Sequence, residues 1–254
     1  MRAPVDTIAA PLFPTKLPWV NTPGGAPVSI IQRERPMLVE FWDFCRPHSM
    51  RTLPYIKTWH ERYAEDGLRI VGVHSPGFDA SRGESAVRSA IARLGIDYPV
   101  LIDSELELWR EYENEGWPAR YLFDGGARLF EYHFGEGGYE ETERAIQELL
   151  GVEREMLAPV RPEDASGVVL AAPTQEQPGA YRGAYQAGGV WAVLDGSGTV
   201  RARDPVSGAS GELEIDAPGA YALLEHARST IGQLELELDG DVRCFATCFT
   251  PGLA

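Results

Sequence analysis

The chain is poor in cysteine and has no long apolar run. It contains 3 cysteines in 254 residues, and this odd number argues against a disulfide framework and fits a reducing compartment. No apolar run approaches the roughly 20 residues that a membrane-spanning helix needs, and Pro4 and Asp6 lie where a signal peptide would become apolar. We therefore expect a soluble, cytoplasmic chain without membrane insertion, or an extracytoplasmic one if the sequence is a trimmed form.

Basic residues are also scarce. The chain carries 23 Lys and Arg against 38 Asp and Glu, which gives a net charge of −15. Residues 1–151 hold 16 basic and 23 acidic side chains, or −7, and the remainder holds 7 and 15, or −8. Nucleic acids and anionic membranes are bound by cationic surfaces, so we expect neither as a partner. We find no pattern typical of a cofactor site and expect no cofactor.

The most informative stretch is an apolar run followed by a turn and a helical pattern. Residues 37–42 are apolar or aromatic except for one acid, which predicts a buried central strand. Pro47 suits the first turn of a helix. Apolar residues then recur at helical spacing at Met50, Leu53, Ile56, Trp59 and Tyr63. Cys45 therefore lies beside a helix N-terminus, where the helix dipole favours a thiolate and lowers the pKa of a cysteine.

Strand and helix patterns alternate over the first half of the chain. Strands are predicted at 68–73, 98–102, 120–123 and 128–134, and helices at 84–94, 105–112 and 139–150. This alternation favours an α/β domain with parallel pairing. We assign residues 35–152 to this domain, residues 153–165 to a linker, and residues 1–34 to an N-terminal extension with a hairpin turn at Pro23 to Gly25.

The remaining residues, 166–254, have a different character. Short apolar runs alternate with turns such as Asp195-Gly-Ser-Gly198, and no helical period is found. Strands are predicted at 191–194, 199–202, 212–215, 221–225, 234–238 and 242–249. Short strands at this spacing are typical of an all-β sandwich with a jelly-roll-like arrangement.

Several motifs together resemble those of a known family. They are Leu17–Thr22, Glu40–Trp42, Arg51–Tyr55, Gly72–Pro76, Trp117–Ala119 and Phe134–Glu143. This part of the chain resembles the TlpA-like thioredoxin domain of DipZ-type thiol-disulfide oxidoreductases, and residues 189–200 are similar to the carbohydrate-binding-like β-domain that follows it there. The resemblance implies a thioredoxin fold followed by a β-sandwich. It also implies that Glu40 is a buried proton acceptor and that Pro118 is a cis proline facing the active-site turn.

The family's Cys-x-x-Cys motif is degenerate in this chain. Without a gap between Trp42 and Pro54, its two cysteine positions fall on Arg46 and Ser49. A shifted register would align Cys45-Arg-Pro-His48 with the motif, but it needs one inserted residue, so we prefer the ungapped register. In either register the second sulfur is missing, and the two-thiol cycle within one motif cannot run.

One hypothesis is a single-cysteine redox enzyme. Cys45 would attack a protein disulfide or a peroxide, with His48 as general base and Arg46 stabilising the thiolate. Glu40 would hold a proton, and Pro118 would shape a substrate groove with Trp42, Ser49 and Trp117. Each residue also has a structural interpretation: Cys45 as a buried turn residue, His48 and Arg46 as exposed side chains, and Glu40 as an ion-pair partner of Arg46 or Arg51.

The alternative is a non-catalytic binding protein. The thioredoxin groove would take an extended peptide, or an anion at Arg46, and the β-domain would dock a glycan or a protein. Tyr181 and Tyr185, in a Gly-rich segment, are the candidates for stacking on a sugar. We expect no metal site, because Cys244 and Cys248 on one face of a strand would lie about 13 Å apart. Both cysteines are better explained as core residues.

Overall fold

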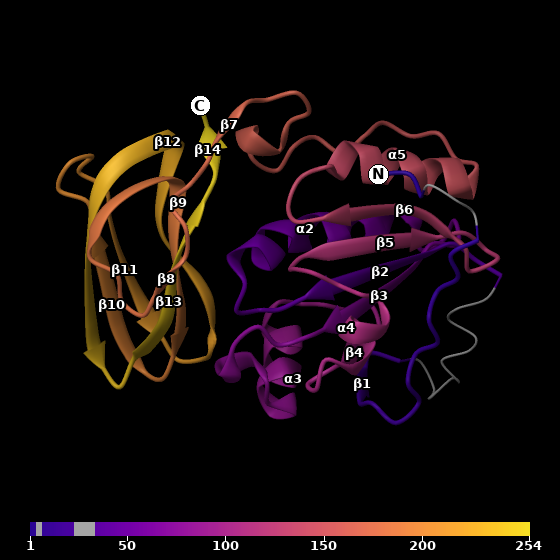
Figure 1. Cartoon of the computed structure of the whole chain (residues 1–254), viewed down its shortest axis with the longest axis horizontal. Coiled ribbons are helices and arrows are strands. Elements are labelled where there is room, and N and C mark those ends of the chain that lie inside the picture. The colour runs from indigo at the N-terminus through magenta and orange to yellow at the C-terminus, as the bar shows by residue number, and fades with distance from the viewer. Residues whose placement is uncertain (4–6, 23–33) are drawn as a thin grey trace. The chain divides into compact units, whose positions relative to one another are not determined.

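The computed structural model describes residues 1–3, 7–22 and 34–254 (Figure 1). The hairpin turn predicted at residues 23–25 lies outside the described residues. The chain divides into two compact units, Met1–Asp43 with Arg51–Ala158, and Phe44–Met50 with Pro159–Ala254. Among the described residues, no helix has both the length and the apolar character needed to cross a bilayer.

The first unit is built on a six-stranded mixed sheet. The strands are β1 (Trp19–Val20), β2 (Met37–Trp42), β3 (Arg69–His74), β4 (Val100–Ile102), β5 (Ala119–Phe123) and β6 (Leu129–Phe134), in the order β1-β4-β3-β2-β5-β6. Strands β2, β3 and β4 are parallel, whereas β1, β5 and β6 run antiparallel to their neighbours. All six residues of β2 are buried, as the apolar run predicted, because β2 lies in the interior of the sheet.

The helices among the described residues are α2 (Pro47–Tyr63), α3 (Glu84–Arg93), α4 (Glu107–Glu111) and α5 (Tyr139–Leu150), with short 3₁₀ turns η2 (Asp79–Ser81) and η3 (Pro162–Asp164). Helix α4 packs through Leu108 on the face of β2 that carries Phe41. On the opposite face, the guanidinium of Arg120 from β5 lies 5.7 Å from the Trp59 ring of α2 and 5.0 Å from the Tyr139 ring of α5. The sheet therefore has helices on both faces.

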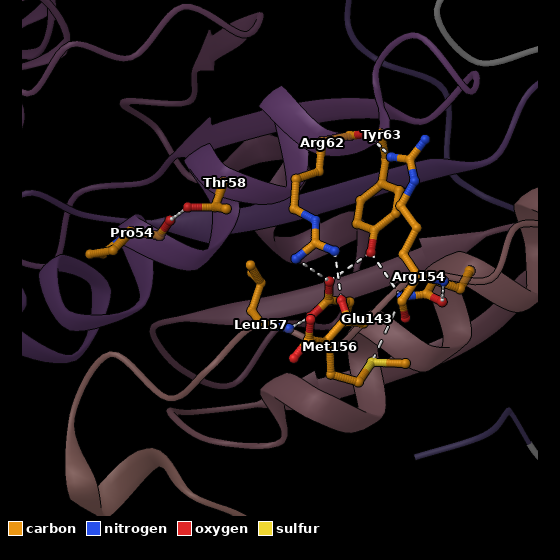
Figure 2. Close-up of polar contacts among 10 residues, drawn as sticks. Pro54, Thr58, Arg62, Tyr63, Glu143, Arg154, Met156 and Leu157 are labelled. Atoms are coloured by element: carbon orange, nitrogen blue, oxygen red, sulfur yellow. Dashed lines mark hydrogen bonds and ion pairs between the residues drawn. The ribbon is translucent and has the colours of Figure 1, made fainter.

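A buried carboxylate joins α5 to α2 and to the segment after α5 (Figure 2). Glu143 is 1% exposed, and its two oxygens accept hydrogen bonds from the Tyr63 hydroxyl at 2.6 Å and the Leu157 amide at 2.8 Å. Arg62 lies 3.4 Å from the same carboxylate. Because three donors from two other segments meet one acid, this contact fixes where the chain leaves the α/β fold.

The C-terminal strands form antiparallel sheets. They are β7 (Leu170–Ala171), β8 (Gln177–Pro178), β9 (Gly183–Asp195), β10 (Gly198–Arg203), β11 (Ser210–Ile215), β12 (Gly219–Gly240), β13 (Arg243–Thr250) and β14 (Gly252–Leu253). Their orders are β11-β10-β12-β9-β13-β8 and β14-β7. The predicted order of an α/β thioredoxin-like sheet followed by antiparallel β-sheets is confirmed.

One detail of the β-sheet prediction is wrong. The runs 221–225 and 234–238 were predicted as separate strands, but both belong to the continuous strand β12. Its pairing with β9 is irregular between Glu225 and Thr230, and the partner shifts by only two residues across this break, from Gly189 to Ala187. The polar residues between the two runs therefore lie in an irregular part of one strand rather than in a turn.

Candidate functional site

The turn that carries Cys45 joins β2 to α2, as the sequence predicts. Phe44 and Cys45 form the turn, and α2 begins at Pro47, with the first helical hydrogen bond from the Met50 amide to the Arg46 carbonyl at 3.1 Å. Cys45 is 0% exposed and Ser49 is 1% exposed. The turn thus holds one fully buried thiol, and the positions of the expected pair carry a guanidinium and a hydroxyl.

A small pocket lies beside this turn. It has a volume of about 220 Å³ and is lined by Arg46, Pro47 and His48 together with the segment 173–176, Cys248 and Phe249. His48 is half-buried there. All these residues belong to the unit formed by Phe44–Met50 and Pro159–Ala254. The turn therefore forms a recess with residues far away in the sequence.

Glu176 supplies the negative charge of this pocket. Its Oε2 lies 3.0 Å from Arg46 Nη1 and accepts a hydrogen bond from the Cys248 thiol at 3.4 Å. Burial and the neighbouring Glu176 carboxylate hold the pKa of the Cys248 thiol far above its usual range. Because Arg46 already faces a carboxylate of this chain, the arrangement argues against the anion pocket considered from sequence.

Glu40 lies in the interior of the first unit. It is 1% exposed, and among the described residues neither of its carboxylate oxygens has a hydrogen-bond partner. Burial raises the pKa of Glu40 to about 8, with Arg120, its cross-strand neighbour on β5, acting in the opposite direction. The carboxyl group is therefore mainly protonated at neutral pH.

The cation that acts on Glu40 is Arg120, not Arg46 or Arg51. The structural interpretation paired Glu40 with Arg46 or Arg51, but Arg46 forms its ion pair with Glu176, and Arg51 Nε lies 2.8 Å from Glu136 Oε1. Arg120 is the cation that acts on the Glu40 carboxyl. Burial lowers the pKa of Arg120, and its Nη2 donates to the Gly137 carbonyl. This pairing depends on β-sheet register, so no local pattern indicates it.

Three of the four residues predicted to form the groove, Trp42, Ser49 and Pro118, are buried. Trp42 is 1% exposed, with the edge of its ring against His74 at 5.1 Å between centroids, and Ser49 is also buried. Trp117 is half-buried, and its indole Nε1 donates to the Ser75 carbonyl at 2.8 Å. The Trp117–Pro118 peptide bond is cis, as the resemblance implied.

A buried polar cluster at the ends of the parallel strands was missed by the sequence analysis. Asp43, directly after β2, accepts a hydrogen bond from the Gly77 amide at 2.7 Å and lies 3.5 Å from His74 Nε2. Asp103, directly after β4, accepts hydrogen bonds from the Glu107 amide at 2.7 Å and the Trp109 amide at 2.9 Å. Two aspartates that each follow a predicted parallel strand were a readable signal, since such strand ends meet at one edge of the sheet.

The tyrosines proposed for sugar stacking are engaged within the β-domain. Tyr185 is 3% exposed, its ring stacks with the rings of Phe249 and His226, and its hydroxyl donates to Asp204 at 3.0 Å. Tyr181 packs edge-on against Phe249, and its hydroxyl donates to the Ala184 carbonyl at 2.8 Å. Tyr185 therefore has no open face for a sugar ring.

Asp204 is the most highly bonded acid of the β-domain. It accepts hydrogen bonds from the Tyr185 hydroxyl at 3.0 Å, the Ser207 hydroxyl at 2.5 Å, the Val206 amide at 2.9 Å and the Gln233 amide at 3.0 Å. Burial alone would raise the pKa of Asp204, but these four donors hold it well below its usual range. The carboxylate is thus a structural anion.

The other cysteines do not suggest a metal centre. A β-bulge between Cys244 and Ala246 interrupts β13. Cys244 packs against the core of the β-domain, and Cys248 contacts Glu176. The even spacing assumed for the two thiols is therefore broken by an extra residue in the strand. Across the described parts of the chain, no group of three or more His, Cys, Asp or Glu residues is arranged to hold a metal ion.

Comparison with known proteins agrees with the fold. No family model matches the chain. Protein DipZ of Mycobacterium bovis is 35% identical over 133 residues, which is 52% of this chain but only 19% of that protein. Thiol-disulfide oxidoreductase YkuV of Bacillus subtilis is 27% identical over 117 residues, 46% of this chain and 78% of that protein.

One solved structure, the solution structure of a thioredoxin-like protein in the oxidized form, matches with a TM-score of 0.50 and 26% identity over 57% of this chain and 97% of that chain. The present chain spans about a fifth of the length of the DipZ relatives it matches. Over about half of its own length it is a thioredoxin-like domain related to DipZ and to thiol-disulfide oxidoreductases, and a C-terminal region of β-sheets follows that domain.

Proposed function

We propose that this relative of the thiol-disulfide oxidoreductases acts by binding rather than by disulfide exchange. The observation that supports the proposal is that Cys45 is fully buried and has no second cysteine in its motif. A cysteine that attacks a disulfide must present its thiolate to the substrate sulfur, and a second thiol must then release the mixed disulfide. Cys45 meets neither requirement in this structure.

The ligand that suits the turn is an extended peptide. The pocket beside the turn presents both charges, from Arg46 and Glu176, and a half-buried imidazole, from His48. Its volume of about 220 Å³ is below the usual range of about 300–1,000 Å³ for drug-sized ligands, so it fits one side chain rather than a whole small molecule. Paired charges also favour a neutral polar group over a free anion.

A second candidate function is redox chemistry by Cys45 alone. The observation in its favour is local, because Cys45 lies two residues before the N-terminus of α2 and next to Arg46. Both features stabilise a thiolate. The reaction would require the turn to open so that the sulfur becomes accessible to a disulfide or a peroxide.

Site-resolved alkylation separates the two functions. Native protein is treated with iodoacetamide between pH 6 and pH 9, and each cysteine is quantified by mass spectrometry. We expect Cys45 to stay unmodified in the native protein and to react fully in guanidinium chloride, which provides the control for reagent and detection. A native titration midpoint well below about 8.5, the value of a free cysteine, would support the redox enzyme instead.

Peptide binding is tested on an array of extended peptides with fluorescence polarisation of the best sequences. We expect Cys45→Ser to bind like the parent and His48→Ala to bind more weakly, because His48 lines the pocket. His60→Ala is the matched control, since His60 is also half-buried on α2 but does not line the pocket. Equal loss in both histidine variants would contradict the assignment of the pocket.

A further inference from the structure

A larger pocket lies in the other unit, on the α/β domain. It has a volume of about 440 Å³ and lies between the C-terminal end of α4 and strands β5 and β6. Its lining includes Tyr112, Tyr121, Tyr132 and Phe134, with Glu111 and Glu113 beside them. This volume is within the range of about 300–1,000 Å³ found for small-molecule sites. None of these residues belongs to the active-site turn.

The aromatic side chains form one continuous wall. Ring centroids lie 5.2 Å apart for Tyr112 and Tyr121, 5.9 Å for Tyr121 and Phe134, and 5.6 Å for Tyr132 and Phe134. Phe134 is 41% exposed, so part of this wall is open at the surface. The faces of aromatic rings carry partial negative charge and attract cations as well as apolar groups.

Two acidic residues add negative charge to this pocket. Glu111 and Glu113 are exposed, and within the described ranges neither forms an ion pair. Tyr112 is 8% exposed and its hydroxyl oxygen is buried, so this residue contributes its ring to the wall rather than a polar group to a ligand.

We propose that this pocket binds a small organic ammonium ion with an apolar or aromatic body. The aromatic wall takes the body and faces the cation, and Glu111 and Glu113 attract the positive charge. An anion of the same size is repelled by the two carboxylates. A neutral molecule gains only the aromatic contacts, so the charge of the ligand decides its affinity.

Isothermal titration calorimetry with three probes of similar size tests the proposal. The probes are 2-phenylethylammonium, neutral 2-phenylethanol and anionic 3-phenylpropionate, added to the full chain at low ionic strength. We expect the ammonium probe to bind best and the carboxylate probe worst. Each of Glu111→Gln and Glu113→Gln should weaken the ammonium probe by about two- to fivefold, the effect of one partly exposed charge pair, while leaving 2-phenylethanol unchanged.

Two further variants control for net charge and for the cavity itself. Glu65→Gln removes one exposed carboxylate outside the pocket and should leave all three affinities unchanged. Ala9→Trp adds a bulky side chain at an exposed residue of the lining and should abolish binding of the ammonium probe. Failure of every probe to bind, equal affinity for the cation and the neutral probe, or an equal loss in Glu65→Gln would each overturn the proposal.

Discussion

Replacing the buried acid of β2 by its amide, Glu40→Gln, should stabilise the protein in a pH-dependent way. In the unfolded chain this carboxyl group ionises near its ordinary pKa of 4.5, whereas burial raises the pKa to about 8 in the folded state. Between these values the folded protein holds a proton that the unfolded chain releases. Stability therefore falls as the pH rises from 4.5 to 8. Glutamine cannot ionise, so it removes this loss.

The magnitude follows from the two pKa values. At pH 7 the interval above 4.5 is about 2.5 pH units, which corresponds to about 3 kcal/mol at about 1.4 kcal/mol per unit. Above pH 8 the difference should level off at about 5 kcal/mol. Arg120 does not lose a partner at pH 7, because Glu40 is already neutral there and the guanidinium keeps its contacts with Gly137, Trp59 and Tyr139.

Urea unfolding of the parent and of Glu40→Gln at several pH values between 4.5 and 8.5 measures this difference. The free energy of unfolding of Glu40→Gln relative to the parent should rise by about 3 kcal/mol between pH 4.5 and pH 7. Glu65→Gln, which changes an exposed carboxyl group, should stay within about 0.5 kcal/mol at every pH. A difference for Glu40→Gln that does not change with pH, or that falls as the pH rises, would refute the reasoning.

Three other variants test the motif and the two structural acids. Arg46→Cys combined with Ser49→Cys restores two thiols in the ungapped register, and we expect it to reduce insulin faster than the parent; no gain would mean that the register is wrong or that the turn is inaccessible. Glu143→Gln weakens the contacts with its three donors and should lower the free energy of unfolding in urea by about 1–3 kcal/mol. Glu141→Gln, exposed on the same helix, should lower it by less than about 0.5 kcal/mol. Asp204→Asn removes a carboxylate with a depressed pKa and weakens its hydrogen bonds, so it should cost about 1–3 kcal/mol at neutral pH, and the difference should shrink as the pH falls below about 4. A constant loss across pH would argue that the charge of Asp204 is unimportant.

Local patterns in the sequence were sufficient for the main helices and strands of the α/β domain, whereas its thioredoxin fold was expected from the family resemblance. The apolar run 37–42 became β2 with all residues buried, and Pro47 is the first residue of α2. The run 139–150, whose first turn is acidic, is α5 without a change of bounds. These elements are determined by neighbouring residues, through apolar periodicity and helix-start chemistry, so a single sequence contains the information.

The polar partners could not be predicted, because they are distant in sequence. Arg46 and Glu176 are 130 residues apart, and Glu40 meets Arg120 only through the register of β2 against β5. The bulge after Cys244 and the irregular part of β12 depend on pairing with β9, which a local pattern does not report. The burial of Cys45 also depends on packing, and it changes the functional interpretation more than any motif does.

The buried acid Glu40 has a property that does not depend on a pair of thiols in the turn. In the family that the sequence resembles, an acid in this strand accepts a proton from the second thiol, a role that Ser49 cannot support. Yet Glu40 remains buried and mainly protonated at neutral pH, with Tyr98, whose pKa is raised partly by Glu40, and Arg120 close to it. A neutral carboxyl group can donate a hydrogen bond, whereas the carboxylate formed above about pH 8 can only accept. Strand β2 therefore carries a group that changes both charge and donor capacity near physiological pH.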